Sequence, residues 1–140
     1  MKYVVISELS IMVVEDQKEA RAVICNMLSE MGVSELHEAG DGREALQKLD
    51  ALYEQDKHLD LVLCDWNMPG VTGVELLRQI RTVSPNLPFL MITGRSDLDS
   101  VKEAKMAGVS AYVAKPFSPE QLEAKIRIVM QKAMMKTKSA

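Results

Sequence analysis

Five polar residues could form one reactive site, because each follows a short hydrophobic run of the 140-residue chain. Glu15 and Asp16 follow one run, and Asp65, Thr93 and Lys115 each follow another. Three carboxylates held close together repel one another unless a cation is present, and hard oxygen ligands of this kind suit Mg²⁺. A hydroxyl and an ammonium opposite the metal could bind the oxygens of an oxyanion. These residue types predict a magnesium site that also binds a phosphoryl group.

Asp65 is the candidate for covalent chemistry. A carboxylate beside Mg²⁺ can attack phosphorus as a nucleophile and form an aspartyl phosphate. Asp65 precedes a tight turn at 68–70, and the backbone carbonyl of Asn67 could supply a further metal ligand. Trp66 is expected to be a partly exposed loop residue. Each polar residue alone would more often be a helix cap or a loop residue, and only their combination at four strand ends favours a functional site.

Hydrophobic runs alternate with amphipathic stretches, which predicts strands and helices in turn. The expected strands are 11–14, 34–38, 59–64, 89–92 and 111–114. The expected helices are 18–31, 41–53, 73–83, 97–107 and one that begins at Ser118 with a capping-box pattern. Nearly continuous hydrophobic strands suit a parallel sheet with helices on both faces, and such sheets bind ligands at the carboxyl ends of their strands. The predicted fold class is α/β: a five-stranded parallel sheet in a doubly wound (βα)5 three-layer sandwich.

The length leaves room for one domain, which we expect to span 10–132. Residues 1–9 would be a leader or a short extra segment, and 133–140 a frayed basic tail. No hydrophobic run is long enough to cross a bilayer, and the first residues lack the pattern of a secretory signal. The two cysteines form neither a disulfide framework nor a zinc site. We therefore expect a cytoplasmic protein that does not insert into a membrane.

Charge is distributed unevenly around the net value of −3. Residues 1–70 carry 14 acidic and 6 basic side chains, a net of −8, whereas residues 71–140 carry 6 and 11, a net of +5. No aromatic residue lies among the lysines near the C-terminus, so a solvated helix face is favoured over contact with nucleic acid.

Four motifs in combination resemble the response regulator receiver domains of two-component signalling, of the CheY-like stand-alone type. They are VVED at 13–16, CDWNMPG at 64–70, TG at 93–94 and YVAKPF at 112–117, and the resemblance covers 10–131. It implies a flavodoxin-like or CheY-like fold and Mg²⁺ as the cofactor, with Mn²⁺ able to substitute. It also implies a protein that is not an enzyme beyond its own phosphotransfer and dephosphorylation.

The resemblance assigns chemical roles to the site residues. Asp65 would accept a phosphoryl group from a sensor histidine kinase or a phosphotransfer protein. Glu15, Asp16, Asp65 and the backbone carbonyl of Asn67 would hold Mg²⁺. Lys115 would pair with the phosphoryl group, and the bond that it forms with the next residue, Pro116, is often cis in this family.

The resemblance also implies a conformational switch and an output by protein contact. Thr93 would bond the phosphoryl group, and Tyr112 would turn inward as Thr93 moves. Asn67 and Arg95 would tune self-dephosphorylation. The downstream protein would bind the fourth helix, the last strand and the last helix, at 98–107, Tyr112 and 118–132. A chemotaxis or flagellar-motor target is favoured, with a phosphorelay or cell-cycle role as the alternative.

Three other functions share parts of the pattern. A Mg²⁺-dependent phosphohydrolase of the haloacid-dehalogenase type needs a second aspartate where this chain has Asn67. A flavodoxin-like FMN binder needs a hydroxyl-rich phosphate loop where this chain has Glu15 and Asp16. A receiver that only binds partners would not need the site residues, all of which are present. Labelling of Asp65 by acetyl phosphate separates the last function from a phosphoacceptor.

Overall fold

The computed structural model describes residues 3–94 and 97–139, with side chains up to Met135. Five strands form one sheet in the order β2-β1-β3-β4-β5, and all neighbouring strands pair in parallel. The strands are β1 (Ser10–Val14), β2 (Glu35–Ala39), β3 (Leu61–Asp65), β4 (Phe89–Thr93) and β5 (Ala111–Ala114). The helices are α1 (Lys18–Glu30), α2 (Gly42–Glu54), α3 (Gly73–Val83), α4 (Leu98–Ala107) and α5 (Pro119–Ser139), with a short 3₁₀ turn, η1 (Ile6–Glu8), before β1. The predicted doubly wound α/β fold is confirmed.

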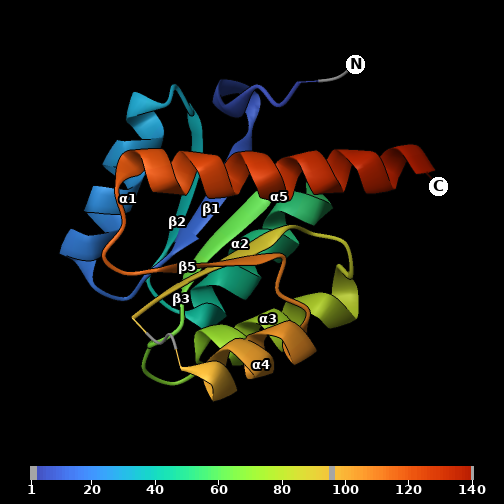
Figure 1. Cartoon of the computed structure of the whole chain (residues 1–140). Coiled ribbons are helices and arrows are strands. Elements are labelled where there is room, and N and C mark those ends of the chain that lie inside the picture. The colour runs from blue at the N-terminus through green and yellow to red at the C-terminus, as the bar shows by residue number, and fades with distance from the viewer. Residues whose placement is uncertain (1–2, 95–96, 140) are drawn as a thin grey trace.

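The helices cover both faces of the sheet, α1 and α5 on one face and α2, α3 and α4 on the other (Figure 1). Side chains alternate along each central strand: Met12 and Val14 of β1 face α2 to α4, whereas Ile11 and Val13 face α1 and α5. Every residue of β1, β3 and β4 is buried. Burial on both faces explains why these strands are continuous hydrophobic runs in the sequence.

Side-chain caps set the starts of most helices. Asp41, Thr72 and Asp97 each accept the backbone N–H three residues later, at α2, α3 and α4. At α5 the backbone N–H of Ser118 donates to Gln121 Oε1 (2.8 Å), and the N–H of Gln121 donates to Ser118 Oγ (3.1 Å). This reciprocal pair is the predicted capping box.

Most elements begin or end within one residue of the prediction, and among the strands only β3 differs by two residues at its start. The third strand begins at Leu61 rather than at residue 59, because Asp60 bonds the backbone of Ser10 with both its N–H and its carboxylate. Helix α5 continues to Ser139, and no glycine or proline after Pro119 interrupts it. Among the described residues, none of the helices has the length and the hydrophobicity needed to span a bilayer.

The segment before β1 packs on the domain. Val4, Ile6 and Leu9 are buried in the hydrophobic layer beneath α1 and α5. This segment lies beside the C-terminal half of α5 (Figure 1), where Arg127 Nη1 donates to the carbonyl of Val4 (3.0 Å). Residues 3–9 therefore contribute side chains to the hydrophobic layer beneath α1 and α5.

Candidate functional site

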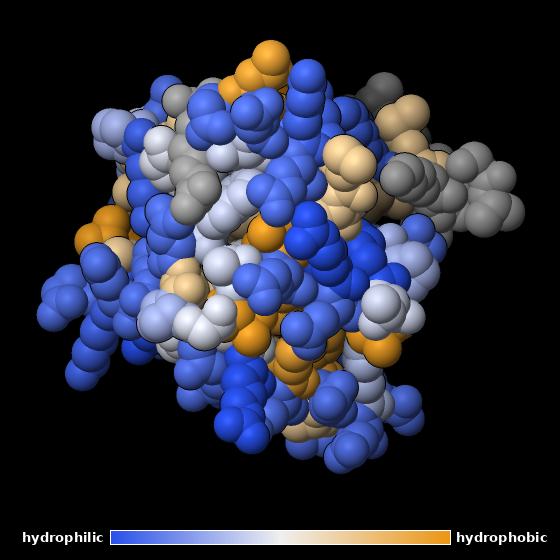
Figure 2. All heavy atoms as spheres, turned by 90° about the horizontal axis from the view of Figure 1, so that it is seen from below, coloured by the Kyte–Doolittle hydropathy of each residue, from blue (hydrophilic) through white to orange (hydrophobic). Residues whose placement is uncertain are grey.

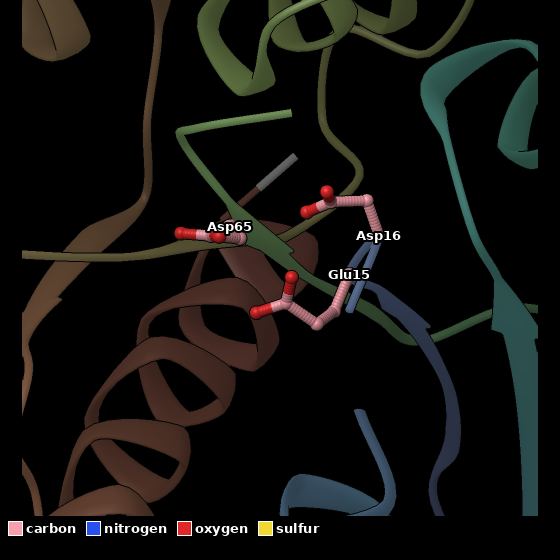
Figure 3. A group of neighbouring side chains, drawn as sticks. All are labelled: Glu15, Asp16 and Asp65. Carbon is pink, nitrogen blue, oxygen red and sulfur yellow. The ribbon is translucent and has the colours of Figure 1, made fainter. Parts of the chain in front are cut away.

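Three carboxylates meet at the carboxyl ends of the neighbouring strands β1 and β3. One carboxylate oxygen each from Glu15, Asp16 and Asp65 lies within 4.8 Å of the other two (Figure 3). Glu15 and Asp65 are buried, with 1% and 7% of their surface exposed, and Asp16 is the most accessible of the three. The predicted gathering of acidic side chains at this edge is present.

Backbone hydrogen bonds beyond the strand ends fix the start of each site segment. The N–H of Glu15 donates to the carbonyl of Ala39 (3.1 Å), and the N–H of Trp66 donates to Ile92 (3.1 Å). The N–H of Lys115 donates to the carbonyl of Thr93 (2.8 Å). Because these bonds continue the parallel pairing, residues from β1, β3, β4 and β5 reach the same edge of the sheet.

Lys115 extends from the end of β5 to the two buried carboxylates. Its Nζ lies 3.3 Å from Glu15 Oε1 and 3.5 Å from Asp65 Oδ1. Its side chain is about one-third exposed, so the ammonium lies where solvent and the buried carboxylates meet. The bond between Lys115 and Pro116 is cis, as the resemblance implied.

The electrostatic balance of the cluster is negative. Burial raises the pKa of Glu15 above its ordinary value, and the nearby charge of Asp65 raises it further. The N–H of Gln17, which donates to Glu15 Oε2 (3.1 Å), and the ammonium of Lys115 act in the opposite direction. The raised pKa shows that burial, together with the charge of Asp65, disfavours the ionised form of Glu15 in the absence of a cation. Hard oxygen donors in this condition fit Mg²⁺.

The loop after β3 folds back onto the start of α3. The N–H of Gly73 donates to the carbonyl of Trp66 (2.9 Å). A Cβ at Gly73 would lie 2.4 Å from the Asp65 carbonyl oxygen and 2.9 Å from Trp66 Cα, so only glycine permits this approach. Because of this fold, Trp66 and Met68 are buried in the layer under α2 to α4, whereas Asn67 is exposed. The expectation that Trp66 is partly exposed is wrong.

Thr93 and Tyr112 lie on the last two strands of the sheet. Thr93 is fully buried at the end of β4 and pairs with Ala114, the residue before Lys115. Tyr112 is half-buried, packs against the layer of α2 to α4, and has a buried hydroxyl oxygen. Arg95, the other residue expected to tune dephosphorylation, lies outside the described residues.

Two supporting residues, Gly73 and Arg21, were not identified from the sequence. Arg21 of α1 donates from Nη1 to the carbonyl of Glu15 (2.8 Å). A single arginine in the first turn of a helix has the same pattern as a solvated side chain, so the sequence carries no signal for this contact. Gly73 had a signal, since a glycine at the first position of a predicted helix is a poor helix former.

Comparisons with known proteins identify the family and agree with this fold. Residues 11–127 match the family model described as the response regulator receiver domain. The chain is 37% identical over 126 residues to the chemotaxis protein CheY of Pseudomonas aeruginosa, covering 89% of the chain and 98% of that protein. It is 34% identical over 134 residues to CheY-3 of Vibrio cholerae, covering 94% and 99%. The structure of V. cholerae CheY4 superposes with a TM-score of 0.77 at 32% identity, covering 86% of this chain and 98% of that one.

Proposed function

This chain belongs to the response regulator receiver family, and from that premise we propose that it accepts a phosphoryl group on Asp65 and signals by contact with another protein. The observation that carries the proposal is the arrangement at the sheet edge. Asp65 is buried beside two further carboxylates, and Lys115 Nζ lies 3.5 Å from its Oδ1. The donor would be a sensor histidine kinase or a phosphotransfer protein, and the proposed location is cytoplasmic.

In the proposed reaction, a carboxylate oxygen of Asp65 attacks the phosphorus of a phosphohistidine. The new bond joins this oxygen to phosphorus, and the bond from phosphorus to the histidine nitrogen of the donor breaks. Glu15, Asp16, Asp65 and the carbonyl of Asn67 would hold Mg²⁺, for which Mn²⁺ can substitute. When bound, the metal neutralises charge on the carboxylates and on the phosphoryl oxygens.

Lys115 and Thr93 would hold the phosphoryl group after transfer. The Lys115 ammonium is already between Glu15 and Asp65, so a small movement would bring it to a phosphoryl oxygen. The Thr93 hydroxyl, buried on the adjacent strand, would donate to another oxygen. Asn67 and Arg95, each two residues beyond one of these strand ends, would tune hydrolysis. The chain would therefore catalyse only its own phosphorylation and dephosphorylation.

The switch would act through Thr93 and Tyr112. When Thr93 moves toward the phosphoryl group, it would leave space into which the Tyr112 ring can turn. Phosphorylation would thus shift the population from one conformation of the chain to another.

The contact face would consist of α4, β5 and α5. On α4, Leu98 and Met106 are exposed by 68% and 88%. Helices α3 and α4 lie lowest in Figure 1, and the view from below shows small hydrophobic groups between hydrophilic side chains (Figure 2).

A chemotaxis or flagellar-motor protein is the proposed target, because the relatives at 34–37% identity are chemotaxis proteins. A phosphorelay or cell-cycle role is the alternative. A pull-down with the beryllofluoride-activated protein distinguishes them. Capture of a motor or chemotaxis protein supports the proposed target, and phosphoryl transfer to a histidine phosphotransfer protein supports the relay. Direct binding to nucleic acid and insertion into a membrane are not part of the proposal.

The phosphoacceptor role is tested by labelling with acetyl phosphate and Mg²⁺. Asp65→Asn should abolish formation of the acyl phosphate, measured by intact mass. Asp56→Asn is a matched control, because Asp56 is exposed, lies outside the site and has a φ of 55° that asparagine also adopts. Stoichiometric labelling of the Asp65→Asn protein would overturn the assignment of Asp65.

A further inference from the structure

Arg21 connects the turn that carries Glu15 and Asp16 to the neighbouring strand β2. Its Nη1 donates to the carbonyl of Glu15 at 2.8 Å, and its Nε pairs with Glu38 Oε1 at 3.1 Å. The Arg21 side chain is only 19% exposed. We propose that Arg21 is a positioning residue that orients the two acidic side chains for binding of the divalent cation. This inference rests on the cation site of the proposed function.

The geometry of the peptide bond explains how one hydrogen bond could orient two side chains. The carbonyl of Glu15 belongs to the planar peptide unit that joins Glu15 to Asp16. Fixing this oxygen restricts the rotation of the whole unit, and the Cα atoms that carry both carboxylates lie at its two ends. The N–H of Glu15 is fixed from the other side by the carbonyl of Ala39 (3.1 Å). Arg21 therefore supplies the restraint that the strand pairing does not provide.

Glu38 determines whether this arrangement is compatible with a dication. A guanidinium keeps its charge at all relevant pH values, so an uncompensated arginine beside the cluster would repel Mg²⁺. The ion pair with Glu38 neutralises that charge next to the site. Removal of Glu38 should weaken Mg²⁺ binding through repulsion, while the contact of Arg21 with the Glu15 carbonyl persists.

Arg127 offers a matched control, because it makes the same pair of contacts far from the cluster. Its Nε pairs with Glu123 Oε2 (3.3 Å), and its Nη1 donates to the carbonyl of Val4 (3.0 Å). Arg127→Met therefore removes a comparable ion pair and a comparable bond to a carbonyl. It should change stability without changing the affinity for Mg²⁺.

The test measures Mg²⁺ binding directly by calorimetric titration, with no phosphoryl donor present. Arg21→Met should weaken the affinity about tenfold, at the low end of the loss seen when outer-shell partners of metal ligands are removed. Arg21→Lys should bind Mg²⁺ more tightly than Arg21→Met but more weakly than the unchanged protein. One ammonium does not reproduce the geometry in which the guanidinium donates to two acceptors. Glu38→Gln should weaken binding by a smaller factor, and Arg127→Met should bind as the unchanged protein does.

A second measurement covers the case in which Arg21→Met is unstable. Each variant is unfolded thermally with and without saturating Mg²⁺, and the shift caused by Mg²⁺ is compared with the shift in the unchanged protein. A reduced shift for Arg21→Met beside a normal shift for Arg127→Met supports the proposal. A normal affinity or a normal shift for Arg21→Met overturns it and leaves the proposed function intact. Absence of Mg²⁺ binding to the unchanged protein overturns both.

Discussion

The Glu15 carboxylate is 1% exposed, and its nearest cation is the ammonium of Lys115 at 3.3 Å. The ammonium does not fully offset the cost of burying the ionised carboxylate, because the pKa of Glu15 is raised, mainly by burial and further by the charge of Asp65. The folded protein therefore binds a proton at this site more strongly than the unfolded chain does. Ionised Glu15 therefore destabilises the metal-free fold, and a divalent cation bound beside it would offset this cost.

The raised pKa of Glu15 predicts a pH dependence for the metal-free protein. Below the ordinary glutamate pKa of 4.5, Glu15 is protonated in both the folded and the unfolded state, so it does not destabilise the fold. The destabilisation by Glu15 develops as the pH rises from 4.5 through the raised pKa of Glu15 in the folded protein. The free energy of unfolding therefore falls over that pH interval. Glu15→Gln lacks this contribution, and its urea midpoint in EDTA should exceed that of the unchanged protein at pH 7.

The advantage of Glu15→Gln should disappear toward pH 4 and should diminish or reverse when Mg²⁺ is added, since only the unchanged protein retains the full set of carboxylates. Urea midpoints at several pH values, with EDTA or with Mg²⁺, measure both effects. A lower midpoint for Glu15→Gln at pH 7 in EDTA would contradict the proposed cause.

The convergence of the candidate site residues could be predicted from the sequence, whereas most of the contacts that support them could not. Asp65, Thr93 and Lys115 each follow a hydrophobic run, and the rule that parallel strands end at one edge was enough to bring them together. The burial of Trp66 depends on the loop after β3 folding back onto α3. The contact of Arg21 depends on the register of α1 against β1. Both features depend on the tertiary structure, and no local sequence pattern indicates them.

The loop between β3 and α3 shows how an element holds Asp65 in place. The loop returns so closely that a Cβ at Gly73 would lie 2.4 Å from the Asp65 carbonyl oxygen. Gly73→Ala must therefore displace backbone, and it should cost about 2 kcal/mol of unfolding free energy, in the usual range for overpacking. The displaced Asp65 should also bind Mg²⁺ more weakly.

Gly94→Ala is the control for Gly73→Ala, because a Cβ at Gly94 would have no atom of the described residues, other than its chain neighbours, within 4 Å. Urea unfolding and Mg²⁺ titration of both variants separate a general effect of alanine from the predicted clash. Equal stability of the two variants would show that the loop moves aside without cost.

Arg81, in the last turn of α3, holds the C-terminal end of α4. It donates to the carbonyls of Gly108 (2.9 Å), Ser84 (3.1 Å) and Leu87 (2.6 Å), and burial lowers the pKa of its guanidinium. Arg81→Met leaves these three carbonyls without their charged donor. It should lower the free energy of unfolding by about 2 kcal/mol, since hydrogen bonds to charged groups are the stronger kind.

Arg78 provides the comparison on the same helix. It forms one exposed ion pair, with Glu103 at 3.2 Å, and exposed pairs contribute at most about 1 kcal/mol. Arg78→Met should therefore change the urea midpoint much less than Arg81→Met does. Similar losses for the two variants would mean that the three carbonyls are satisfied by water when Arg81 is removed.

The strands were located within two residues at the centre and at the edges of the sheet alike: β5 begins and ends as expected, β2 is shifted by one residue, and β3 begins two residues later. Strands β1, β3 and β4 are buried throughout, so their hydrophobic runs located them within a residue or two. Strand β2 is an edge strand with mostly polar residues, and its sequence signal was weak. No glycine or proline marks the end of α5, so the sequence predicts where this helix begins but not where it ends.

At the scale of the whole molecule, the two ends of the chain support each other. Arg127 of α5 donates to the carbonyl of Val4, across 123 positions of sequence. Val4 and Ile6 lie in the hydrophobic layer formed with α1 and α5. The N-terminal segment therefore covers part of the core beneath α5, the helix that would form one side of the proposed contact face.

The contribution of this segment can be measured at Ile6, which is 3% exposed and packs in the layer beneath α1 and α5. Ile6→Ala should lower the free energy of unfolding by about 2–4 kcal/mol, the cost of removing a buried aliphatic side chain from a core. The adjacent Val5 is 47% exposed, so Val5→Ala should change it by less than about 0.5 kcal/mol. Urea unfolding of both variants gives the comparison. If Ile6→Ala costs no more than Val5→Ala, the segment before β1 is not part of the cooperative fold, and α5 is held by the sheet and α1 alone.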